Sequence, residues 1–77
     1  MKTKPSETTY TAAFFEMQGR RRLLAEGILT LQEYSRECII LLCRDARVKI
    51  RGSGLEIALI SQSKAAVTGL IDGLEFF

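Results

Sequence analysis

The sequence predicts a mostly β protein: a single small antiparallel sheet of about six short strands, laid out as a meander or rolled up on itself. Apolar and polar residues alternate with a period of two from Arg20 onward, which is the periodicity of strands with one covered face. Glycines and short polar segments separate the alternating runs, and short connections favour antiparallel neighbours.

The size of the chain is that of one domain. It has 77 residues, of which 47% are hydrophobic, so it has the composition of a folded protein. Residues 1–9 are polar and hold the only proline, and we interpret them as a mobile N-terminal tail ahead of a single domain over residues 10–77. A core this small contributes only about 3–5 kcal/mol of net stability. We therefore expect the protein to form a homo-oligomer.

The segment from Tyr10 to Gln18 has two interpretations. It fits a short N-terminal helix, with Thr9 or Thr11 as N-cap and Gly19 just past its end. It fits a first strand equally well, because patterning does not distinguish the two for short apolar runs.

Two runs follow in the middle of the chain. Residues 22–32 alternate around Gly27 and predict two strands, or one strongly bent strand, followed by a polar turn over 33–36. Residues 37–44 are apolar on both faces, which is typical of a central strand or of a strand with one face in a subunit interface.

The last third of the chain predicts four short strands. Residues 47–51 alternate cleanly, and Gly52-Ser53-Gly54 is the strongest hairpin signal in the sequence, because glycines supply the positive φ angles of tight turns. The remaining elements are a strand over 55–60, a loop over 61–64, a strand over 66–71, a bend at Asp72-Gly73 and a short strand over 74–77.

Basic residues form the best candidate binding surface. The net charge is only +2, from 11 basic and 9 acidic residues, which does not by itself indicate nucleic acid. The basic residues concentrate in two places, and the candidate surface consists of Arg20, Arg21, Arg22, Arg47, Lys49 and Arg51. This surface fits an acidic protein, a phosphate or a nucleic acid, or it is a solvated outer face of the sheet. The alternative function is accordingly a small basic β-barrel that binds single-stranded nucleic acid.

Catalytic chemistry is sparse. There is no histidine, no P-loop and no GxGxxG or GxSxG pattern, so we predict no enzyme activity, no metal and no cofactor. Cys38 and Cys43 lie five residues apart, about 16 Å along a strand and on opposite faces, beyond the reach of a disulfide. Two small buried apolar residues are the simplest interpretation, and a thiol-dependent enzyme or redox switch is a third hypothesis.

Targeting signals are also lacking. The first 15 residues contain no apolar stretch typical of a secretory signal, and the longest apolar run, Cys38 to Cys43, is far too short to span a bilayer. We expect a cytoplasmic protein with no membrane insertion of its own.

The order of these features resembles the YabP/YqfC family of sporulation proteins, from about Gly19 to Phe77. The resemblance lies in the runs RRRLLAEGILTLQEYSRECIILL, VKIRGSGLEI and VTGLIDGLEF. The positions that match the family pattern are Gly27-Ile28, Tyr34, Glu37, Ile50-Arg51-Gly52, Leu55, Ile57, Gly69, Ile71 and Phe76. Asp45-Ala46 departs from the pattern, since the family usually has a glycine before the VKI-type strand.

The resemblance implies a function in endospore formation in a spore-forming bacterium. We expect a non-enzymatic structural or protein-interaction module, located in the mother cell or at the surface of the spore envelope. Its partners are then proteins of the sporulation machinery or spore envelope, including copies of itself. The family offers no catalytic residues or cofactor to carry over.

Overall fold

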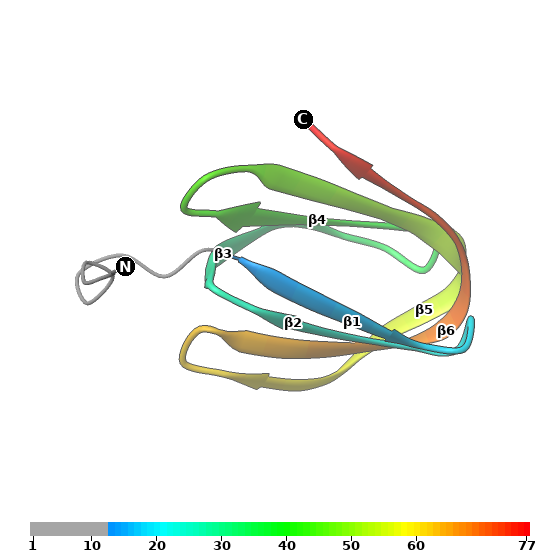
Figure 1. The fold of residues 1–77 in the computed structure, drawn as a ribbon. Coiled ribbons are helices and arrows are strands. Elements are labelled where there is room, and N and C mark those ends of the chain that lie inside the picture. The colour runs from blue at the N-terminus through cyan, green and yellow to red at the C-terminus, as the bar shows by residue number, and fades with distance from the viewer. Residues whose placement is uncertain (1–12) are drawn as a thin grey trace, which may run out of the picture.

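The fold, seen in a computed structural model, is described for residues 13–77, so the predicted tail over residues 1–9 lies outside the described residues. The described part is all β (Figure 1). Its six strands are β1 (Phe14–Gln18), β2 (Arg22–Glu26), β3 (Ile28–Tyr34), β4 (Cys38–Cys43), β5 (Arg47–Ser61) and β6 (Lys64–Phe76). The predicted fold class is therefore confirmed.

All strands belong to one open antiparallel sheet with the order β1-β2-β6-β5-β4-β3. A simple meander, the first of the two predicted layouts, is wrong, because β2 pairs with β6 and the next strand, β3, lies at the far edge. Gly27 makes this change of direction with a φ of 86°, a conformation that other residues rarely adopt. The rolled sheet, the other predicted layout, describes the fold.

Two long strands, β5 and β6, give the sheet its rolled shape. Both bend midway, so the sheet folds back on itself in two halves (Figure 1). The β1–β2 half contains β1, β2, residues 56–61 of β5 and residues 64–68 of β6. The β3–β4 half contains β3, β4, residues 47–51 of β5 and residues 73–76 of β6.

The predicted hairpin at Gly52-Ser53-Gly54 is wrong, as is a separate strand over 74–77. The chain stays in one strand through the glycines, where the β5–β6 ladder is irregular, and the hairpin forms instead at Gln62-Ser63, inside the predicted loop. Here the glycines provide space for a neighbouring strand. A Cβ at Gly52 would overlap the Leu70 carbonyl oxygen, and one at Gly69 would lie 2.6 Å from the Gly54 carbonyl oxygen.

The core fills the space between the two halves. Alternate residues of each strand point inward, and none of the buried residues among those described is polar or charged. The largest fully buried side chains are Leu23, Ile39, Leu41, Val48, Ile50, Leu55 and Val67. Burial of such side chains stabilises each by about 1.5–3 kcal/mol relative to exposure, and this is the main force that holds the halves together.

The first described segment is a strand. Phe14–Gln18 pairs with β2, so the helix interpretation of this segment is wrong for these residues. Phe15 packs edge to face on Phe76, with ring centroids 5.4 Å apart, and so links the free edge of the β1–β2 half to the end of β6.

Substitutions at the bend test this description. Gly52→Ala should lower the free energy of unfolding by about 3 kcal/mol or more, because the new methyl group meets rigid backbone. Gly54→Ala is the matched control, since a Cβ there meets no atom within 4 Å and the cost is only that of its φ of 61°, about 1 kcal/mol. Urea denaturation measures both, and equal losses would contradict the close approach of β5 and β6.

Candidate interaction surfaces

The predicted basic stripe on β5 lies on the outer face of the β3–β4 half. Arg47, Lys49 and Arg51 alternate with buried Val48 and Ile50, as the sequence predicts. Side chains from the C-terminal end of the chain contact two of its arginines. The Arg47 guanidinium lies over the Phe77 ring, 4.7 Å from its centroid, and Arg51 Nε lies 3.5 Å from a carboxylate oxygen of Glu75.

Lys49, between the two arginines, is half-buried and stands between Ile40 and Glu75 in the sheet register. The stripe is thus partly neutralised and partly used to cover apolar strands.

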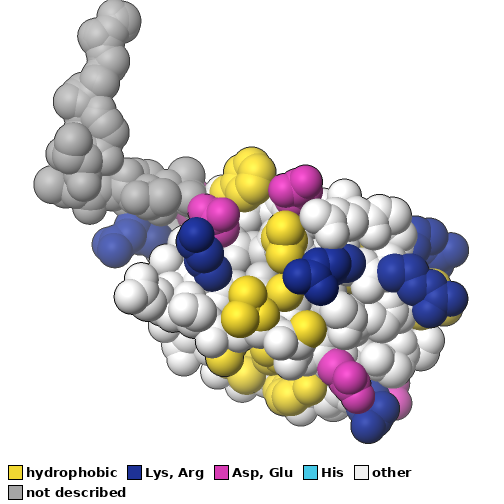
Figure 2. Space-filling view, turned by 90° about the horizontal axis from the view of Figure 1, so that it is seen from below, with side chains coloured by type: hydrophobic (Ala, Val, Ile, Leu, Met, Phe, Trp, Pro, Cys, Tyr) yellow, Lys and Arg dark blue, Asp and Glu magenta, His cyan; other side chains and the backbone are white. Residues whose placement is uncertain are grey.

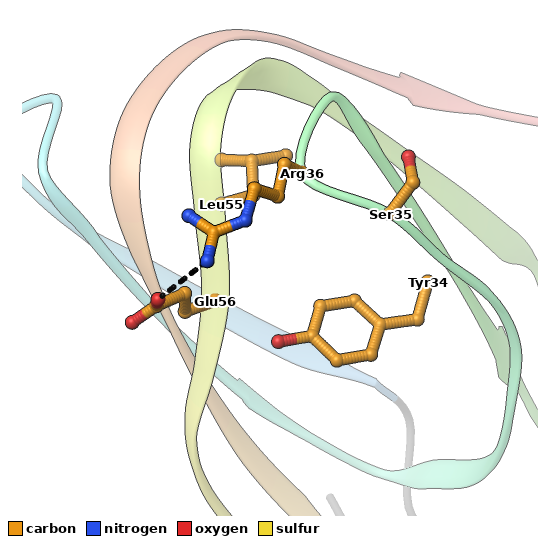
Figure 3. Close-up of a pocket in the computed structure, with 5 residues that line it drawn as sticks. All are labelled: Tyr34, Ser35, Arg36, Leu55 and Glu56. Atoms are coloured by element: carbon orange, nitrogen blue, oxygen red, sulfur yellow. Dashed lines mark ion pairs between the residues drawn. The ribbon is translucent and has the colours of Figure 1, made fainter.

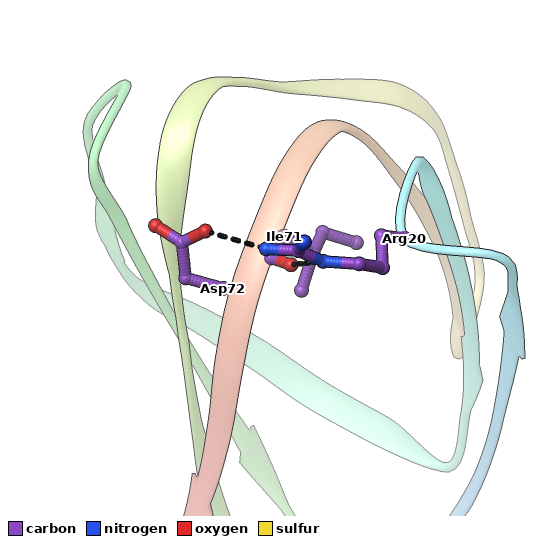
Figure 4. Close-up of polar contacts among 3 residues, drawn as sticks. All are labelled: Arg20, Ile71 and Asp72. Atoms are coloured by element: carbon purple, nitrogen blue, oxygen red, sulfur yellow. Dashed lines mark hydrogen bonds and ion pairs between the residues drawn. The ribbon is translucent and has the colours of Figure 1, made fainter.

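The second basic group, Arg20 to Arg22, lies elsewhere. Arg20 Nη2 donates to Asp72 Oδ1 at 3.0 Å and Arg20 Nε donates to the Ile71 carbonyl oxygen at 3.3 Å (Figure 4). The Ile71 amide in turn donates to the Arg20 carbonyl oxygen at 2.8 Å, so Arg20 joins the β1–β2 turn to the bend of β6. Arg21 is exposed in this turn and Arg22 points out from the β1–β2 half. Asp72 is followed by Gly73, which pairs with Arg51 on β5, so Arg20 lies near the Arg51 end of the basic stripe, whereas Arg22 lies on the β1–β2 half.

A pocket of about 240 Å³ opens between the end of β3 and the bend of β5 (Figure 3). It is lined by Tyr34, Ser35, Arg36, Leu55 and Glu56. The Tyr34 hydroxyl accepts a hydrogen bond from the Ile57 amide at 3.1 Å, and Arg36 pairs with Glu56 at 3.6 Å. These contacts fasten β3 to β5, and the pocket brings together one acid and one base that already neutralise each other.

The feature that sequence analysis missed is an apolar row on the outer face of the β1–β2 half. Leu24, Ala66 and Leu59 are direct cross-strand neighbours on β2, β6 and β5. Leu59 is 53% exposed, Leu24 is half-buried and Ala66, between them, is buried. We call these three residues the outer apolar row. The sequence predicts Leu59 on the same face as Ile57, but the ladder is irregular between Ile57 and Leu59, which moves Leu59 to the outer face. The only indication of this row in the sequence is that apolar residues occupy both faces of these strands.

Figure 2 shows this side of the molecule, with hydrophobic side chains gathered in its middle and charged side chains around them. A shallow pocket of about 230 Å³ adjoins the row, lined by Leu24, Ala25, Glu26, Leu59, Lys64 and Ala65. The outer face of an antiparallel sheet is usually polar, so this apolar row sets the face apart.

The two cysteines lie in surroundings that disfavour the thiolate form. Both are free thiols; Cys43 is buried in the core and Cys38 is half-buried on the outer face. Burial raises the pKa of both thiols, and the Glu33 carboxylate raises that of Cys38 further while Lys49 and Arg51 act against it. Residues 13–77 contain no group of three side chains suited to a metal ion.

Within the described part of the chain, no helix has the length and apolar character needed to cross a membrane.

These features define the class: a small protein built on one bent antiparallel sheet, whose distinctive surface is an apolar row. The sequence model of the YabP family matches residues 11–77, and the chain belongs to this family, as the resemblance predicts. No curated protein matches the chain. Membership of the YabP family suggests a function related to sporulation, and the family is not a known enzyme family.

Thiol chemistry can be tested directly. Because the pKa of each thiol is raised, little thiolate exists at neutral pH, and we expect slow alkylation of the folded protein that accelerates as the pH rises. Cys38 should react before the buried Cys43. Mass spectrometry of a timed alkylation measures both rates, with urea-unfolded protein as the control. Rapid modification of either cysteine at neutral pH would revive the thiol hypothesis.

The basic stripe is tested with single-stranded oligonucleotides. Since Arg47 and Arg51 are engaged by Phe77 and Glu75, we expect no binding in a fluorescence polarisation titration at low salt. Binding that weakens steeply with salt and is lost in Lys49→Glu would contradict this expectation and support the barrel-like nucleic-acid alternative.

Proposed function

We propose that this protein is a non-enzymatic protein-interaction module of endospore formation, which binds a protein partner through the outer apolar row. It acts in the mother cell or at the surface of the developing spore envelope. Its partners are proteins of the sporulation machinery or spore envelope, including copies of itself.

The observation that carries the proposal is the row itself. Leu24, Ala66 and Leu59 stand side by side across three strands, and Leu59 exposes 53% of its apolar surface there, with half-buried Leu24 beyond buried Ala66. An apolar centre ringed by charged residues is the usual anatomy of a protein interface, in which the centre supplies affinity and the rim excludes water. Membership of the YabP family supplies the sporulation context.

The non-enzymatic part of the proposal has separate support. The sequence has no histidine, and the two pockets described above contain no cysteine. The one acid–base pair in the pocket at Tyr34, Arg36 with Glu56, is exposed and mutually neutralised. An exposed pair of this kind is a weak contact on a surface, typically worth about 1 kcal/mol or less.

The test is complementation in a spore-forming host from which the gene for this protein has been deleted. Leu59→Lys should fail to restore heat-resistant spores, because a charge in the apolar row prevents partner binding. Leu29→Lys is the matched control, since Leu29 lies on β3 with nearly the same exposure, 55% against 53%, and should restore them.

Circular dichroism and urea denaturation of both purified variants must show an intact fold. Restoration of spores by Leu59→Lys would refute the function of the row. A deletion strain that sporulates normally would refute the sporulation function itself.

A further inference from the structure

The identity of one partner can be inferred from the charges around the outer apolar row. Antiparallel register places Glu26 and Lys64 side by side along one flank of the row. Along the other flank it places Arg22 beside Thr68, with Glu56 next in line on β5. Each flank of the row therefore carries one acid and one base. On the first flank the acid lies on β2 and the base on β6, whereas on the other flank the base lies on β2 and the acid on β5.

This arrangement is self-complementary. If a second copy is turned by a two-fold rotation about an axis along the row, each flank of one copy faces the opposite flank of the other. Glu26 then faces Arg22 of the second copy, and Arg22 faces its Glu26. Lys64 faces Thr68 of the second copy and lies diagonally between Glu56 and Arg22 of that copy. The two Glu26–Arg22 pairs, one on each flank, are therefore the opposite charges that face each other directly.

We propose that the β1–β2 half is a homodimer interface, in which the outer faces of two copies stack on each other about this two-fold axis. This inference rests on the proposed function, since it names the first partner of the row. The apolar residues meet their own counterparts, Leu59 near Leu59 and Leu24 near Leu24, at the roughly 10 Å spacing of stacked sheets whose strands stay within about 30° of each other.

The rim of this interface contains two kinds of like-charged contact. Lys64 lies diagonally opposite Arg22 of the second copy, whose own facing residue is Glu26. Glu16 stands beside Leu24 at the β1 end of the row, so the two-fold axis brings it near Glu16 of the second copy. Both carboxylates lie at the exposed edge of the sheet, where water and salt screen their repulsion. Glu56 also contacts Arg36 at 3.6 Å, a surface pair whose exposed side chains remain available to Lys64 of the second copy.

Sedimentation equilibrium over a wide range of protein concentration tests the dimer. The full chain should show a monomer–dimer equilibrium, and Leu59→Lys should raise its dissociation constant at least about tenfold, because it places two like charges in the apolar centre. Leu29→Lys should leave the constant unchanged. A full chain that remains monomeric at every concentration, or a dimer indifferent to Leu59→Lys, would overturn the proposal.

Charge exchange tests the two-fold arrangement itself. Arg22→Glu sets an acid at position 22 opposite Glu26 of the second copy, and Glu26→Arg sets a base at position 26 opposite Arg22 of the second copy. Each variant alone should therefore dimerise more weakly than the unaltered chain. Mixed in equal amounts, the two variants should recover dimerisation, because every pair in the mixed dimer is then acid to base. Mixing without recovery would refute this arrangement.

The dimer and the proposed function fail in different ways. If the full chain is monomeric while Leu59→Lys still abolishes spore formation, the row binds another protein and the dimer is refuted alone. If the dimer forms as described and Leu59→Lys still restores spores, the dimer stands and the function of the row is refuted.

Discussion

The close approach of β5 and β6 at their common bend is the constraint on which the rest of the structure depends. Gly52 leaves room for the Leu70 carbonyl, and Gly69 leaves room for the Gly54 carbonyl. Two 13- to 15-residue strands can therefore cross from one half of the sheet to the other without breaking their ladder. The core forms between the halves because of this bend, and Arg20 reinforces it from the β1–β2 turn (Figure 4).

The irregularities of the ladder have a second consequence, which concerns the surface. The shift between Ile57 and Leu59 keeps Ile57 facing the core and turns Leu59 outward. Leu59 there joins Leu24 and Ala66, which point away from the core on their own strands. The sheet thereby has one face covered within the chain and an apolar row on the other, and this row is the surface proposed to bind a partner. The outer face of the β3–β4 half carries the basic stripe instead of an apolar row. Phe77 and Glu75 contact the arginines of that stripe.

The sequence predicted the fold class and most strand positions, because period-two alternation is a local property. It correctly placed the start of β5 at Arg47, a strand within residues 37–44 and the break at Gly27. It failed at Gly52-Ser53-Gly54, because a glycine that makes a turn and a glycine that admits a neighbouring strand look the same in sequence. The pairing of β2 with β6 was also beyond reach, since contacts between distant segments have no local signature.

The surface was harder to predict than the fold. Basic residues stand out in composition, so the sequence directed attention to Arg20–Arg22 and the stripe on β5, where Asp72, Glu75 and Phe77 contact the arginines. The outer apolar row depends on a one-residue shift at Ala58, and a shift of this size reverses the face of every residue that follows. Only the register of the folded sheet reveals it.

The central claim is that the outer apolar row meets a protein partner during sporulation. The most direct measurement is photo-crosslinking in a sporulating host, with a photoreactive amino acid at position 59 and, as a control, at position 29. The account predicts a crosslinked product at position 59 that appears only after sporulation begins, and none at position 29. The absence of a product at position 59, or equal products at both positions in vegetative cells, would contradict it.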